Sequence, residues 1–104
     1  MNVQIRFMGV IADIAGTRQQ MLGFDGVPTL RGLLTELERQ YGPEFGSRIF
    51  RSSTAPRLLQ MCTRIFLNKN IVDDRALDEA LPVPADAASP PEVLVYFLPA
   101  VCGG

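Results

Sequence analysis

The sequence predicts an α+β domain in which one main helix packs across a mixed sheet of four to five strands. Three segments lead to this prediction. Residues 2–8 alternate between apolar and polar side chains, residues 29–41 repeat apolar residues at helical spacing, and residues 93–98 form an unbroken apolar run. With 104 residues the chain fits a single domain with a conventional core.

The first two predicted strands lie near the N-terminus. Residues 2–8 form a strand with its apolar side chains on one face and polar side chains on the other. Residues 9–16 are bounded by glycines and are predicted to be a wide, apolar loop that folds back onto the core. A returning strand is expected at residues 17–24, with Leu22 and Phe24 inward.

The main helix is predicted at residues 29–41, with Thr29 as its N-cap. Gly42 and Pro43 are predicted to end it, because proline cannot continue a helix. One stripe of the helix is apolar and should lie on the sheet as plain core. Its members are Leu30, Leu33, Leu34, Leu37 and Tyr41.

The middle of the chain gives weaker signals. Residues 44–60 show no sustained period and are predicted to be a loop tied to the core at its ends. A third strand is expected at residues 62–67, followed by a turn at residues 68–70 that suits positive φ angles and by a short returning strand. Residues 75–81 are expected to make a helical turn, and a proline-rich loop at residues 82–91 leads to the last strand.

The last strand is expected at the centre of the sheet. Residues 93–98 are apolar or aromatic at every position, which is typical of a strand with neighbours on each side and both faces buried. We therefore place it between the first and third strands. Pro99 has no N–H for a ladder, so regular pairing should stop there. The domain is accordingly assigned to residues 1–98 and a flexible tail to residues 99–104.

The tail ends in Gly103 and Gly104. Because glycine has no Cβ, such an end can pass in extended form through a narrow channel and present its carboxylate to another protein. A frayed chain end is the alternative interpretation. The tail is predicted to be the working part of the molecule.

Composition excludes several function classes. A net charge of −1 gives no indication of nucleic-acid binding, and no apolar run approaches the ~20 residues of a membrane span. The chain has no histidine, the commonest general base and metal ligand, so neither a self-contained hydrolase nor a metal site is expected. We expect a cytoplasmic protein that is not itself an enzyme.

The predicted order of elements is that of the ubiquitin-like β-grasp fold, and the chain resembles the ThiS/MoaD family of sulfur carriers. The resemblance covers nearly the whole chain, and its tightest motif is the tail. Within the family, the tail is most similar to that of CysO-type carriers, whereas Cys102 and the proline-rich stretch depart from the family pattern. The matching stretches are 7–16, 29–34, 66–68, 92–93 and 97–104.

The resemblance implies a carrier function. A ubiquitin-activating-like enzyme would use ATP to adenylate Gly104, and the product would be a thiocarboxylate that donates sulfur to a biosynthetic enzyme for an amino acid such as cysteine, thiamin or the molybdopterin cofactor. No bound cofactor is implied. Met8 and Leu98 are candidates for partner docking, although each alone could be an ordinary core or surface residue. The residues expected to thread into the partner are Val101, Cys102 and Gly103.

Three function classes remain open from the sequence. The chain could be a sulfur carrier, a ubiquitin-like modifier that acylates lysines through the same adenylate, or an interaction module such as the small subunit of a molybdopterin-synthase-type complex. Cys102 could capture an acyl group or form a mixed disulfide. The alternative, which we favour, is a small tail residue, because no neighbouring cation in the sequence would lower the pKa of its thiol.

Overall fold

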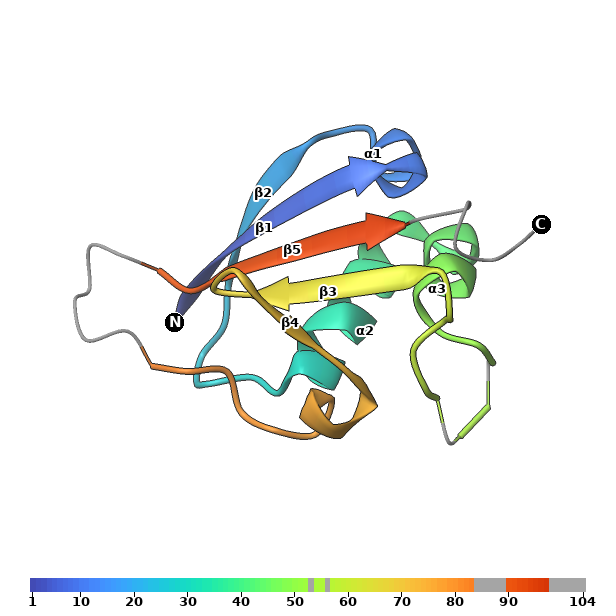
Figure 1. Cartoon of the computed structure of the whole chain (residues 1–104). Coiled ribbons are helices and arrows are strands. Elements are labelled where there is room, and N and C mark those ends of the chain that lie inside the picture. The colour runs from blue at the N-terminus through green and yellow to red at the C-terminus, as the bar shows by residue number, and fades with distance from the viewer. Residues whose placement is uncertain (53, 56, 84–89, 98–104) are drawn as a thin grey trace.

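A computed structural model describes residues 1–52, 54–55, 57–83 and 90–97. The strands form one sheet in the order β2-β1-β5-β3-β4, in which β1 and β5 are parallel and the other neighbours are antiparallel (Figure 1). This arrangement confirms the predicted α+β class with a mixed sheet. The strands are β1 (Asn2–Gly9), β2 (Gln19–Gly23), β3 (Thr63–Leu67), β4 (Asn70–Val72) and β5 (Glu92–Phe97).

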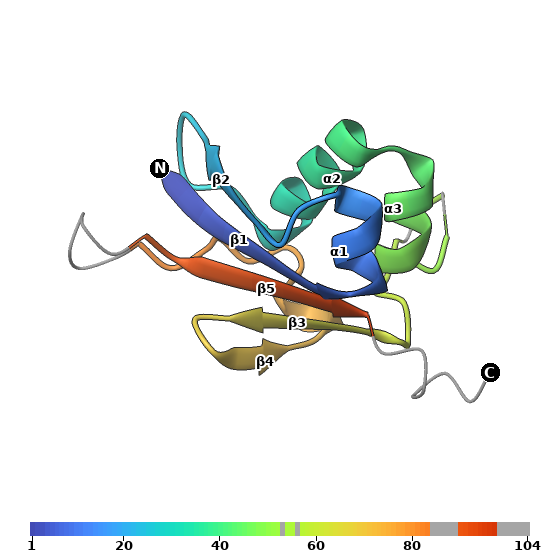
Figure 2. The same ribbon diagram turned by 90° about the horizontal axis from the view of Figure 1, so that it is seen from above.

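The helices lie on one face of the sheet. Figure 2 shows α1 (Val10–Ala15), α2 (Leu30–Tyr41) and α3 (Pro43–Ile49) on the same side, and none of these three helices covers the opposite face. Among the described residues, no helix has the length and apolar character needed to cross a membrane.

The first hairpin has the predicted strands but a different connection. Val3, Ile5 and Phe7 of β1 are at most 2% exposed, and Leu22 of β2 is 7% exposed. Residues 9–16 were predicted to be a loop, which is wrong, because they contain α1. Ile11 is fully buried, so the segment does fold back onto the core, and Gly16 ends the helix with φ 75° and its N–H bonded to the Ala12 carbonyl.

The main helix forms where the sequence predicts it. The Thr29 hydroxyl accepts a hydrogen bond from the Gly32 N–H at 3.0 Å and caps the N-terminus of α2. The four leucines of the predicted stripe are at most 1% exposed. Tyr41 extends the stripe, and its ring stands edge-on to Phe7 with centroids 5.8 Å apart.

A further helix, α3, starts where α2 was predicted to lead into a loop. Pro43 ends α2 and at the same time occupies the first turn of α3, where its missing N–H costs no hydrogen bond. Phe45 is fully buried and Ile49 is 1% exposed, so α3 contributes its own side chains to the core. The helix spans seven residues, too few for an apolar period to be recognised in the sequence.

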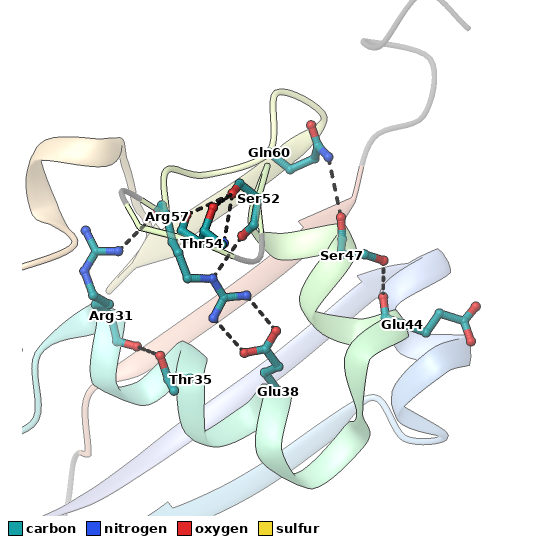
Figure 3. Close-up of polar contacts among 9 residues, drawn as sticks. All are labelled: Arg31, Thr35, Glu38, Glu44, Ser47, Ser52, Thr54, Arg57 and Gln60. Atoms are coloured by element: carbon teal, nitrogen blue, oxygen red, sulfur yellow. Dashed lines mark hydrogen bonds and ion pairs between the residues drawn. The ribbon is translucent and has the colours of Figure 1, made fainter.

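The segment after α3 is held by an arginine. Arg57 donates two hydrogen bonds to the Glu38 carboxylate, at 2.8 and 2.7 Å, and a third to the Ser52 carbonyl at 3.0 Å (Figure 3). Its guanidinium also lies 4.3 Å from the ring centroid of Phe50. These contacts tie the segment to α2, and they lower the pKa of Glu38 because the arginine stabilises its charged form.

The remaining elements are close to their predicted places. The turn between β3 and β4 has positive φ at Asn68 (48°) and Lys69 (73°), as expected. The predicted helical turn is shorter and earlier than residues 75–81, because only Asp74–Ala76 form a 3₁₀ helix, η1. Leu77 and Leu81, which follow η1, are buried and fasten this connection to the core.

The central strand is confirmed in position but not in burial. As predicted, β5 lies between β1 and β3. Val93 and Val95 face the helices and are fully buried. Leu94 and Tyr96, however, are only half-buried on the uncovered face, so the prediction that both faces are buried is wrong. The run has no polar alternation because its outward side chains are apolar as well.

Candidate functional site

The residues predicted to do the chemistry lie outside the described part of the chain. This applies to Leu98 and to the tail residues Val101, Cys102, Gly103 and Gly104, and also to the domain boundary predicted at 98/99. Their roles stay predictions. The site is therefore built from the end of β5, which leads into the tail, and from the surface around it.

Phe97, the last residue of β5, is held from both sides. It pairs with Gly9 at the end of β1 and with Thr63 at the start of β3. Its ring is 8% exposed and lies beneath the Arg48 guanidinium, whose carbon is 5.3 Å from the ring centroid. The position from which the tail begins is therefore fixed by two strands and by α3.

Gly9 permits the close approach of β1 to the end of β5. Its φ of 73° and ψ of −149° lie in a region essentially restricted to glycine. A Cβ at this position would be 2.9 Å from the Phe97 carbonyl oxygen and 3.6 Å from the Tyr96 ring. Sequence analysis treated Gly9 only as a loop boundary. A glycine directly after an alternating strand was the signal for this close backbone approach.

Thr63 joins the start of β3 to the last turn of α3. Its hydroxyl donates a hydrogen bond to the Arg48 carbonyl, and the residue is 4% exposed. The Nε of Arg48 is buried and has no hydrogen-bond partner among the described residues. The Arg48 guanidinium thus lies over Phe97, the residue after which the tail begins. We call this position the root of the tail.

Met8 lies where a docking residue is expected. It is 46% exposed, on the face of the sheet away from the helices, and it pairs with Tyr96 of β5. Tyr96 pairs in turn with Arg64 of β3. These side chains cross the sheet at the end from which the tail emerges, which is compatible with docking, and the docking role of Met8 stays a prediction.

A second row of side chains makes this face more apolar. Leu94 of β5 pairs with Phe66 of β3, which pairs with Ile71 of β4. Leu94 and Phe66 are half-buried, and Ile71 is 58% exposed. We call Met8, Leu94, Tyr96, Phe66 and Ile71 the open face. Of these five residues only Met8 was predicted as a docking residue, although the alternation of neighbouring strands places the other four on the same side.

Within the described part of the chain, the carboxyl groups with a shifted pKa belong to ion pairs with arginines. The lowered carboxyl pKa values belong to Glu36, Glu38, Asp73 and Asp78, and hydrogen bonds from arginines are the main cause in each case. Among the described residues, Phe97 instead pairs with Gly9 and Thr63 and lies beneath the Arg48 guanidinium. The described part of the chain also contains no cluster of His, Cys, Asp or Glu that could hold a metal ion.

Solved structures share this architecture. SAMP1 from Haloferax volcanii is 22% identical, with a TM-score of 0.69 over 93% of this chain and 94% of that chain. A putative molybdopterin converting factor, subunit 1, from Pyrococcus furiosus is 16% identical, with a TM-score of 0.67 over 94% and 98%. CysO, an antigen from Mycobacterium tuberculosis, is 18% identical, with a TM-score of 0.63 over 92% and 98%.

These likenesses show the fold. No protein-family model and no curated protein matches the chain. The structural matches extend over nearly the full length of both partners, so they include the sheet, the helices and the strand that leads to the tail. They confirm the ubiquitin-like β-grasp fold, and at the level of the fold they confirm the resemblance that the sequence predicted.

Proposed function

We propose that the chain is a sulfur carrier whose C-terminal Gly104 is converted to a thiocarboxylate by a partner enzyme. One observation carries the proposal: in a β-grasp fold shared with CysO and a molybdopterin converting factor subunit, the central strand leads directly into a tail that ends in two glycines. The tail continues from a strand that is paired on both sides, which suits a domain that presents its own end.

The proposed chemistry follows from the low reactivity of a carboxylate. The partner transfers AMP from ATP to the Gly104 carboxylate, which forms an acyl-adenylate and releases pyrophosphate. Sulfide then attacks the acyl carbon and expels AMP, which carries away one of the two carboxylate oxygens. If a persulfide attacks instead, the product is an acyl disulfide, and a thiol must cleave its S–S bond and leave as a mixed disulfide to release the thiocarboxylate. The resulting thiocarboxylate is a nucleophile that a second enzyme accepts as a source of sulfur.

This division of labour explains the composition of the site. The activating enzyme supplies ATP, the acid–base groups and the channel, so the carrier needs no histidine of its own. The carrier supplies two features. Gly103 and Gly104 make the end thin enough to enter a channel, and the strand pairs at Phe97 give the tail a fixed origin. The open face with Met8 would contact the activating and sulfur-accepting enzymes.

The direct test is the intact mass of the purified chain after incubation with ATP, sulfide and an adenylating enzyme of the ubiquitin-activating class from the same organism. We expect a product heavier by the difference between one sulfur atom and one oxygen atom. Deletion of Gly104 should abolish this product while the circular dichroism spectrum and melting temperature stay unchanged. Gly26→Ala is the matched control, because a Cβ at Gly26 would have no atom within 4 Å.

Other outcomes would redirect the proposal. An undiminished thiocarboxylate yield after deletion of Gly104 would refute it. Conjugates joined through lysine, in place of the thiocarboxylate, would identify a protein modifier. A stable complex with a larger subunit that survives gel filtration, without any transferable sulfur on the chain, would identify a permanent small subunit.

A further inference from the structure

Only some of the basic side chains of this protein form ion pairs with carboxylates in the described part of the chain. The chain has ten of them, and five form ion pairs with carboxylates in the structure: Arg6, Arg31, Arg39, Arg57 and Arg75. The other five form no ion pair within the described part of the chain: Arg18, Arg48, Arg51, Arg64 and Lys69. Three of these five gather at one end of the sheet.

Arg48 and Arg64 flank the end of β5, and Arg51 lies nearby in the segment after α3, where its side-chain Nε donates a hydrogen bond to the Leu59 carbonyl at 2.8 Å. Arg48 lies over the ring of Phe97 on the helix side, as described above. Arg64 follows Thr63, the residue that pairs with Phe97, and therefore lies beside Tyr96 on the open face. Arg51 follows α3, and its backbone N–H bonds to the Leu58 carbonyl at 2.9 Å. We call these three residues the arginine collar.

Two members of the collar line the same hollow. Arg51 and Arg64 face a space of about 650 Å³ between the segment that precedes β3 and the segment that follows β4. Met61, which is 68% exposed, also borders it. The carboxylates of the opposite wall are partly engaged, since Asp73 pairs with Arg75 and Asp74 accepts the Leu59 N–H. Glu79 completes that wall.

We propose that the arginine collar docks an acidic surface of the activating enzyme, next to the opening that receives the tail. This inference rests on the proposed function and adds the chemistry of the partner surface. The chain as a whole has a net charge of −1, so a partner cannot be steered by its overall charge. A local group of cations at the root of the tail can steer it, because nearby opposite charges accelerate and orient encounter.

The composition of this region favours a protein partner. Arginine and methionine are enriched in protein interfaces whereas lysine is depleted, and the collar consists of arginines beside the exposed Met61. Guanidinium groups can bind carboxylates through two parallel hydrogen bonds, which adds orientation to attraction. Because Arg64 and Met8 both flank Tyr96, one partner surface can cover the collar and the near end of the open face together.

The test compares charge reversals at the collar with one at the other end of the sheet. Arg51→Glu and Arg64→Glu are the collar variants. Lys69→Glu is the control, since Lys69 also has no ion pair with a described residue and lies in the turn between β3 and β4. ATP–pyrophosphate exchange by the purified adenylating enzyme gives kcat and KM for each carrier. We expect each collar variant to raise KM by about tenfold with kcat unchanged, and the control to leave both unchanged.

Salt provides an independent measurement. Raising NaCl from about 0.1 M to about 1 M shortens the Debye length from about 10 Å to about 3 Å. The KM of the unmodified chain should therefore rise toward that of the collar variants. Arg51→Gln and Arg64→Gln, which remove charge without reversing it, should raise KM by less and keep the inference testable if a reversal impairs folding.

The outcomes separate the two proposals. If ATP–pyrophosphate exchange is normal with the unmodified chain and its KM is the same for collar and control variants, the docking role of the collar is refuted and the proposed function is not. If the unmodified chain supports no ATP–pyrophosphate exchange, the proposed function is refuted. In that second case, NMR titration with a glutamate-rich peptide tests whether the collar binds an acidic protein segment. Shifts confined to residues 48–51 and 61–64, and lost with the matching glutamine peptide, support it, and shifts elsewhere or none refute it.

Discussion

Replacing Gly9 by alanine should destabilise the root of the tail. The backbone at Gly9 has φ 73° and ψ −149°, and holding any other residue in this region costs of the order of 1–3 kcal/mol. The new Cβ would also lie 2.9 Å from the Phe97 carbonyl oxygen, a backbone atom that can move only with β5. We therefore expect the upper part of this range, a loss of about 2–3 kcal/mol in the free energy of unfolding.

Urea unfolding followed by circular dichroism measures this loss, since the chain has no tryptophan for fluorescence. The melting temperature should fall by roughly 10–20 °C. Gly26→Ala is the control, because Gly26 has no strained φ and no neighbouring atom within 4 Å of a Cβ, and it should change stability by less than about 1 kcal/mol. If Gly9→Ala is as stable as the unmodified chain, the strands do not approach as closely as the structure shows and our account of the fixed tail origin fails.

Three further predictions follow from other contacts. Arg57 lowers the pKa of Glu38 below its ordinary 4.5, so their pair stabilises the fold above that pH and is lost as the pH falls through the lower folded value. Glu38→Gln should thus cost about 1 kcal/mol at neutral pH and much less in acid, and an equal loss at both would contradict this. Leu34→Ala, at a fully buried site, should cost about 2–5 kcal/mol in urea unfolding, whereas Met21→Ala, at a site 50% exposed, should cost far less. Met8→Lys should raise the KM of the adenylating enzyme without lowering the melting temperature, and an unchanged KM would exclude Met8 from docking.

Much of the fold could be predicted because several sequence signals agree with one another. Thr29 as N-cap and the leucine stripe define α2, and the alternation in β1 defines its buried face. The short helices α1 and α3 could not be predicted, since six and seven residues are too few to show a helical period. Pro43 has a double role that the sequence does not reveal, because a residue that ends one helix is also well suited to begin another.

The site was harder to predict than the fold because it depends on pairing between distant segments. The outward residues of β5 were predicted to be buried, since an apolar strand inside a sheet normally is. Whether Leu94 and Tyr96 are covered depends on where the helices pack, and they pack on the other face (Figure 2). The arginine collar has no local signature either, because Arg48, Arg51 and Arg64 come together only through α3 and the start of β3.

Strand direction explains why Met8, near the N-terminus, can act beside a C-terminal tail. Because β1 and β5 are parallel neighbours, their C-terminal ends lie at the same end of the sheet, and Met8 pairs with Tyr96. An antiparallel pairing of β1 with β5 would place Met8 at the opposite end of the sheet, away from the tail. β3 is antiparallel to β5, so its first residues, Thr63 and Arg64, lie at the end of the sheet where β5 ends. A partner that binds the chain directly after Phe97 must therefore cover side chains from β1 and β3. Substitutions of these side chains should weaken the binding of the partner and leave the reaction proposed for Gly104 unchanged once the partner is bound.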